Sequence, residues 1–107
     1  MNSIEHFIDG KTVKGSSKRT AKVFNPATGE VSSKVNLANT ADLNKAVDAS
    51  KKAFPKWSEK TPLFRARVLF KFKELIEKNY DELTKIIVSE HGKVYEDAKG
   101  SLTRGLE

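Results

Sequence analysis

The chain has 107 residues, of which 37% are hydrophobic and 32% charged, and it contains no cysteine. Without cysteine, these residues can form no disulfides, thiolate nucleophiles or cysteine metal sites. No apolar run approaches the ~20 residues that a membrane-spanning helix needs, so we expect no membrane partner. The first residues, MNSIEHFIDGK, lack the basic start and apolar run of a secretory signal, which favours a cytoplasmic location.

The formal net charge of +6 makes nucleic acid a possible partner. The densest basic group is Lys11, Lys14, Lys18, Arg19 and Lys22. It lies in a segment with the pattern of strands and turns, without a recognition helix or an aromatic run suited to base stacking. We therefore favour an ordinary solvated surface and expect no nucleic-acid partner.

The first strands are predicted from turn residues. Asp9-Gly10 between short apolar runs is a strong hairpin signal, so residues 7–13 read as strand, turn and strand. A second extended run, 20–24, is followed by the turn NPATG, in which Gly29 can adopt positive φ.

A final strand is predicted from alternation. Residues 31–37 place Val31, Ser33, Val35 and Leu37 on one side and polar residues on the other. We expect residues 1–38 to form a small antiparallel β-meander, too slight to be stable alone.

Residues 40–107 show only helical patterns. Thr40 is the predicted N-cap of the first helix, Pro55 is expected to end or kink it, and Trp57 is assigned to the connection that follows. Thr61-Pro62 is expected to open the next helix, with the proline at its first position. The fold class is thus α+β, a meander followed by three or four helices.

The last two helical patterns lie within residues 79–107. Asp81 is the predicted N-cap of the first, and Gly92 its C-terminal stop. Ala98, Leu102 and Leu106 then recur every fourth residue, which places them on one side of a helix. Because the pattern stops in mid-helix at Glu107, we expect this chain to be the front of a larger protein.

Few residues suggest chemistry. His6 and His91 lack the spacing of metal ligands, so no metal site is predicted. The carboxylates on the helices are scattered, and a glycine-rich phosphate loop is absent. No catalytic or cofactor-binding residue is predicted.

Arg104 is the exception. It lies between Gly100 and Gly105, and small neighbours can admit a ligand or another backbone. A guanidinium binds a carboxylate through a two-pronged pair of hydrogen bonds. A surface arginine near a helix C-terminus is the alternative reading of the same residue.

Several segments together identify a family. In order they are FIDGK, NPATGE, AVDASKKAFPKW, RARVLFKF, SEHGK and DAKGSLTRG. Their succession resembles the start of the aldehyde dehydrogenase superfamily, and within it the CoA-acylating methylmalonate-semialdehyde dehydrogenase branch. The resemblance runs from Phe7 to Glu107.

The resemblance implies that residues 1–107 are an N-terminal part of the NAD-binding domain of an α/β enzyme several times longer. In that family a cysteine attacks the aldehyde, hydride passes to NAD, and in this branch CoA takes the acyl group. The cysteine and the catalytic glutamate would follow Glu107, so the isolated chain is expected to be inert. Its implied partners are the remainder of the dehydrogenase chain and, in the parent enzyme, further copies of itself.

The resemblance also gives Arg104 a role. The matching arginine in the semialdehyde branch lines the aldehyde tunnel and faces the distal carboxylate of the substrate. The alternative hypothesis is a non-catalytic binding or assembly module, with the apolar stripe of Ala98, Leu102 and Leu106 as its interaction surface.

Overall fold

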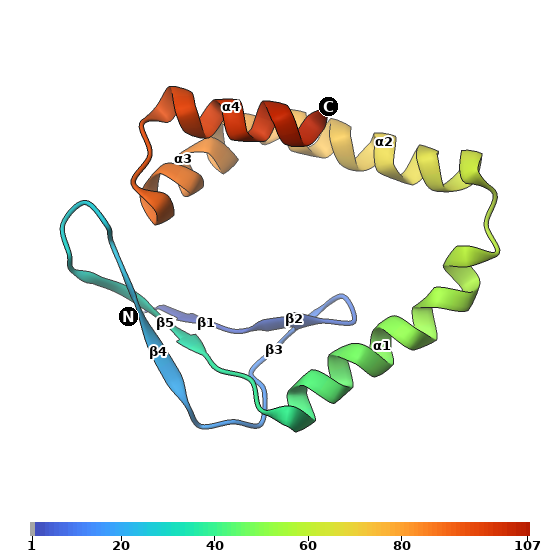
Figure 1. Cartoon of the computed structure of the whole chain (residues 1–107), viewed down its shortest axis with the longest axis horizontal. Coiled ribbons are helices and arrows are strands. Elements are labelled where there is room, and N and C mark those ends of the chain that lie inside the picture. The colour runs from blue at the N-terminus through green and yellow to red at the C-terminus, as the bar shows by residue number, and fades with distance from the viewer. Residues whose placement is uncertain (1) are drawn as a thin grey trace. The chain divides into compact units, whose positions relative to one another are not determined.

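A computed structural model describes residues 2–107 (Figure 1). The strands are β1 (Asn2–Ile4), β2 (His6–Ile8), β3 (Lys11–Val13), β4 (Thr20–Phe24) and β5 (Val31–Asn36). The helices are α1 (Thr40–Ser58), α2 (Pro62–Lys78), α3 (Tyr80–His91) and α4 (Tyr95–Leu106). The α+β class and the four helices agree with the sequence prediction. Within residues 2–107, none of the helices is both long and apolar enough to cross a membrane.

The chain forms two compact units. One contains residues 1–24 and 31–60, and the other contains residues 25–30 and 61–107. The strands and α1 thus belong to the first unit, whereas the turn between β4 and β5 belongs with α2, α3 and α4. All strands lie within residues 2–36 and all helices within residues 40–106.

The strands form two sheets, and the predicted single meander is wrong in this respect. β2 and β3 pair antiparallel around Asp9-Gly10, and both turn residues have positive φ, as the sequence predicts. β4 and β5 also pair antiparallel. However, β1 pairs parallel with β5, in the order β1-β5-β4. Only Glu5 separates β1 from β2, so the chain leaves one sheet and enters the other there.

Burial on β5 is not confined to the side that its alternation marks. Ser33 is buried and Val31, Val35 and Leu37 are half-buried, as predicted, but Asn36 is buried too. The Asn36 carboxamide accepts a hydrogen bond from the Ser3 hydroxyl at 3.3 Å and donates to the Lys14 carbonyl at 3.0 Å. These bonds join β1, β5 and the loop after β3, and they satisfy a side chain that would otherwise be costly to bury.

α1 begins with a capping box one residue earlier than predicted. Asn39, rather than Thr40, is the N-cap: its side chain accepts from the Asp42 N–H at 2.9 Å, and Asp42 accepts from the Asn39 N–H at 3.1 Å. The Asp42 carboxylate also accepts from the Ser16 N–H and hydroxyl, both at 2.8 Å. The Asn39 N–H, followed by the Ser16 donors, lowers the pKa of Asp42 to about 2. This buried carboxylate therefore ties the loop after β3 to the start of α1.

The end of α1 also differs from the prediction. Pro55 lies inside the helix, which continues to Ser58, so Trp57 belongs to α1 and not to the connection. A proline in the last turn removes only one intrahelical hydrogen bond, and the Pro55 carbonyl still accepts from the Glu59 N–H at 3.1 Å.

Gly15 is required by a close approach. Its φ is +81°, and a Cβ built there would lie 2.8 Å from the imidazole ring of His6. We expect Gly15→Ala to reduce the stability of the β2–β3 region by about 2–3 kcal/mol, from the left-handed backbone and the contact together. Gly10→Ala is the matched control, since Gly10 has φ +73° but no atom within 4 Å of its Cβ. Amide hydrogen exchange of β2 and β3 measures the difference, and equal losses in the two variants would show that the His6 ring moves aside.

The second unit is built around the pair α3 and α4, which lie side by side (Figure 1). Thr84 of α3 and Ala98 of α4 are fully buried between them, and Leu102 and Leu106 are half-buried. The predicted exposed stripe on α4 is therefore wrong, because α3 covers much of it.

Both ends of α3 are fixed. Gly92 has φ +79° and ends α3 as predicted, and a Cβ there would lie 3.1 Å from the ring of Pro26. α3 starts at Tyr80, so Asp81 lies in its first turn and is not the N-cap. At the start of α2, Thr61 caps the helix and Pro62 follows, as predicted.

Candidate functional site

Arg104 lies in the last turn of α4 and is exposed. On a helix, Asp97, Gly100, Ser101 and Arg104 share one side, away from Leu102 and Leu106 that face α3. A Cβ on Gly100 would lie 3.3 Å from Nη1 of Arg104, so the guanidinium lies over the missing side chain of this glycine. The expectation that small neighbours admit a ligand or another backbone stays a prediction: the space at Gly100 holds the Arg104 guanidinium itself, and a Cβ on Gly105 meets nothing within 4 Å.

The Arg104 guanidinium is held by Ser101. Nη2 of Arg104 donates to the Ser101 hydroxyl oxygen at 3.3 Å. The same oxygen accepts a hydrogen bond from Nζ of Lys93 at 3.0 Å. The Ser101 hydroxyl in turn donates to the Asp97 backbone carbonyl at 3.2 Å, which fixes its rotamer on the helix. One neutral oxygen therefore gathers two cationic side chains.

This group carries a local positive charge. Within residues 2–107 the ion pairs are Lys71–Glu74, Lys73–Glu77 and Lys85–Asp81, so neither Lys93 nor Arg104 has a carboxylate partner. Asp97 lies on the same side of α4, but its carboxylate forms no ion pair there. The arrangement can bind an anion, since both nitrogens retain donors that Ser101 does not use.

A second polar cluster joins the start of α4 to α3. Tyr95 donates its hydroxyl to Asp81 at 2.6 Å, and Lys85 pairs with the same carboxylate at 2.7 Å. The Lys85 ammonium, followed by the Tyr95 hydroxyl, lowers the pKa of Asp81, and hydrogen bonding to Asp81 raises the pKa of Tyr95 and of Lys85. Each group in the cluster has its partner, so we assign it a structural role.

The first unit contains a cleft of about 490 Å³ between the β2–β3 hairpin and α1. Its charged lining residues are Asp9, Lys11, Asp42, Lys45, Asp48 and Lys52. Three lysines face three aspartates, so the lining has no net charge that would select an ion. The Asp42 carboxylate is already fully engaged with Ser16 and Asn39.

The two histidines belong to different units. His6 is in β2, with its Nε2 buried and without a hydrogen-bond partner, and His91 is the last residue of α3. Within residues 2–107, no three histidine or carboxylate side chains come close enough to share a metal ion.

The prediction from the sequence named Arg104 as a site residue but not Lys93 or Ser101. The spacing of Ser101, three residues before Arg104, was the available signal, because side chains three apart meet on a helix. Lys93 offered none, since it lies outside the helix and reaches Ser101 only through the turn after Gly92.

A family model described as the aldehyde dehydrogenase family matches residues 12–107. The malonate-semialdehyde dehydrogenase of Pseudomonas aeruginosa is 48% identical over 107 residues, which is 100% of this chain and 21% of that protein. Malonate-semialdehyde dehydrogenase 3 of Geobacillus kaustophilus is 43% identical, over 98% of this chain and 22% of that protein. The chain thus spans about a fifth of the length of these relatives.

Solved structures give the same result. A protein described as a methylmalonate-semialdehyde dehydrogenase from Sinorhizobium meliloti 1021, complexed with NAD, matches with a TM-score of 0.95 and 51% identity. The match covers 99% of this chain and 22% of that one. The methylmalonate-semialdehyde dehydrogenase of Oceanimonas doudoroffii matches with a TM-score of 0.94 and 46% identity, over 99% of this chain and 22% of that one.

Proposed function

Because the chain belongs to the aldehyde dehydrogenase family, we propose that it is the N-terminal segment of an NAD-dependent dehydrogenase of malonate or methylmalonate semialdehyde. The similarity over the whole chain to malonate-semialdehyde dehydrogenases carries this proposal. The uncovered cationic group at Arg104 supports the substrate class, since these aldehydes bear a terminal carboxylate. Transfer of the acyl group to CoA is part of the proposal and rests on the resemblance of the sequence motifs.

This segment would contribute to substrate binding rather than to the chemical step. It has no cysteine, and within residues 2–107 we find no glycine-rich strand-to-helix turn that would hold a dinucleotide. We therefore place NAD and CoA binding in polypeptide outside these residues, and we expect the 107-residue chain alone to be inert. The cytoplasmic location and the homo-oligomer stay predictions.

Arg104 is our proposed ligand for the substrate carboxylate. Its guanidinium is accessible and lies over Gly100, and within residues 2–107 it makes one side-chain hydrogen bond, at 3.3 Å. Several of its N–H groups are therefore available to a carboxylate. A charge-assisted pair of this kind would orient the aldehyde by its far end.

One side of α2 is our proposed contact with the remainder of the dehydrogenase. Arg65, Leu69, Phe72 and Ile76 share this side of the helix. Leu69 is 60% exposed and Phe72 59%, although their side chains are apolar. Nε of Arg65 is buried and has no hydrogen-bond partner within residues 2–107. An exposed apolar surface of this kind calls for a covering segment, and a carbonyl or carboxylate on that segment would supply the acceptor that Nε of Arg65 lacks.

Kinetics of the full-length protein that carries these residues test the function. We expect NAD reduction and acyl-CoA formation with malonate or methylmalonate semialdehyde, and none with the 107-residue chain under the same conditions. A folded full-length protein that reduces no NAD with either semialdehyde would contradict the proposal.

A further inference from the structure

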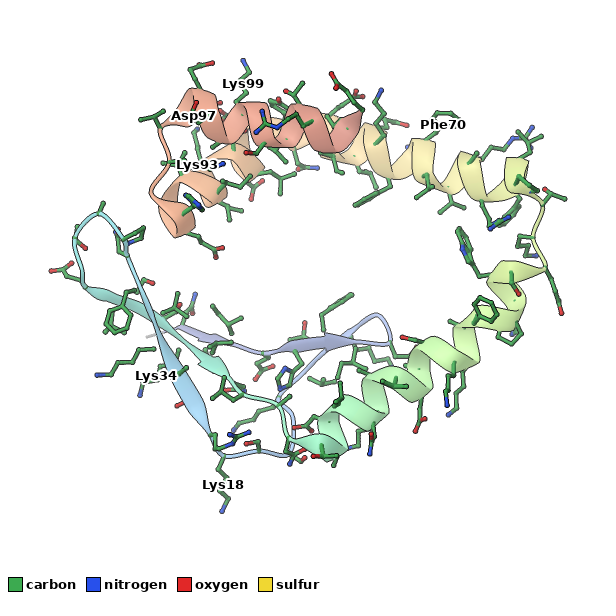
Figure 2. All side chains as sticks on the ribbon, viewed as in Figure 1. Lys18, Lys34, Phe70, Lys93, Asp97 and Lys99 are labelled. Carbon is green, nitrogen blue, oxygen red and sulfur yellow. The ribbon has the colours of Figure 1, made fainter. Side chains whose placement is uncertain are left out.

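Two cationic side chains converge on the Ser101 hydroxyl. Lys93 comes from the turn between α3 and α4, and Arg104 reaches back from the last turn of α4. Nζ of Lys93 lies 3.0 Å and Nη2 of Arg104 lies 3.3 Å from the same Ser101 oxygen, so the two nitrogens are close to each other. Figure 2 shows Lys93 where the chain enters α4, whereas Lys99 extends from the helix.

This convergence opposes the repulsion between two like charges. Long basic side chains on a surface normally spread into water, because ordering them costs rotamer entropy. Here Ser101 offers only a neutral oxygen, and within residues 2–107 no ion pair compensates either charge. The free energy of holding the two cationic side chains together becomes favourable when an anion occupies the space between the two nitrogens.

We propose that Lys93 is a second ligand for the carboxylate of the aldehyde substrate, acting together with Arg104, and that Ser101 positions both. The inference rests on the proposed function, which supplies Arg104 and the class of ligand. A carboxylate has two oxygens, so it can accept from the ammonium of Lys93 with one and from the guanidinium with the other. Lys93 adds the Coulombic attraction of a point charge, and the planar guanidinium of Arg104 adds directional hydrogen bonds.

The backbone on both sides of Lys93 makes this position reproducible. Gly92 ends α3 in the left-handed conformation, and α4 begins two residues after Lys93, at Tyr95. Ser101 lies on α4, where its bond to the Asp97 carbonyl sets the hydroxyl. The site is therefore built on the joint of two packed helices.

The test uses the full-length enzyme and the variants Lys93→Met, Lys93→Arg and Lys99→Ala. Methionine keeps an unbranched stem and removes the charge, so we expect KM for malonate semialdehyde to rise about three- to tenfold. KM for the uncharged aldehyde propanal and both kcat values should stay within about twofold. Lys93→Arg should restore most of the loss. Lys99→Ala, on α4 but outside the group, should leave all values unchanged.

Binding of malonate gives a readout independent of turnover. The inhibition constant of malonate, measured with propanal as substrate, should rise in Lys93→Met by the same factor as KM for malonate semialdehyde. Ser101→Ala should weaken both by a smaller factor, and Ser101→Thr, which keeps the hydroxyl, should restore them.

Two results would overturn the inference, and a third would overturn the proposed function instead. If Lys93→Met changes neither constant, Lys93 is no ligand. If it lowers the melting temperature of the ligand-free enzyme and leaves both constants unchanged, its partner is a carboxylate of the protein itself. If the unmodified enzyme shows no preference for carboxylated over uncharged aldehydes, the proposed substrate class fails.

Discussion

Replacing Arg104 with alanine in the full-length enzyme is expected to raise KM for malonate semialdehyde about 10- to 100-fold, because a hydrogen-bonded charge pair is worth about 1.5–3 kcal/mol. KM for propanal should stay within about twofold, since propanal has no carboxylate for the guanidinium to bind. Steady-state kinetics on the two aldehydes measure the contrast. The change should appear in KM rather than in kcat, because the carboxylate is bound equally before and during the reaction.

Arg104→Lys is the matched variant. It keeps the positive charge but loses the planar fork, so Arg104→Lys should raise KM for malonate semialdehyde by about three- to tenfold. Arg104 forms no ion pair within residues 2–107, so neither variant should disturb the packing of α4 on α3. Equal losses on both aldehydes would show that Arg104 shapes the site without binding the carboxylate.

Local signals in the sequence predicted the local structure. Asp9-Gly10 indicated the hairpin because the turn needs two successive positive φ values, which Asp and Gly tolerate. Gly92 indicated the end of α3 because glycine readily adopts the positive φ of a helix C-terminus. Thr61 and Pro62 indicated the start of α2 through a side-chain acceptor and a preset φ. These features depend on neighbours within four residues, so the pattern alone carries them.

Features set by distant residues escaped prediction. β1 pairs with β5 about thirty residues away, and the polar Asn2 and Ser3 show no alternation that would mark a strand. Asn39 rather than Thr40 caps α1 through the capping box with Asp42, a local signal that was missed, and Ser16, far away in the sequence, bonds to both side chains. Lys93 reaches Ser101, and so Arg104, through the turn after Gly92, which no helical spacing predicts. The β1–β5 pairing is the tertiary case, because no local pattern encodes a partner that far along the chain.

The second large effect is expected on the side of α2 that bears Leu69 and Phe72. If the remainder of the dehydrogenase covers this side, Phe72→Ala should lower the free energy of unfolding of the full-length protein by about 3–5 kcal/mol, as for buried phenylalanines. The same substitution should change the helical circular dichroism of the 107-residue chain little, because Phe72 is 59% exposed there.

Phe70 is the matched control for Phe72. It is 68% exposed and lies on another side of α2 (Figure 2). By helical spacing this side also carries Lys73 and Glu77. We expect Phe70→Ala to cost less than about 1 kcal/mol in the full-length protein, as most surface substitutions do. Urea unfolding of the two variants makes the comparison. A small, equal loss would mean that the side bearing Arg65 and Phe72 stays in contact with solvent. A selective loss at Phe72 would mean that the remaining polypeptide packs on this side of α2.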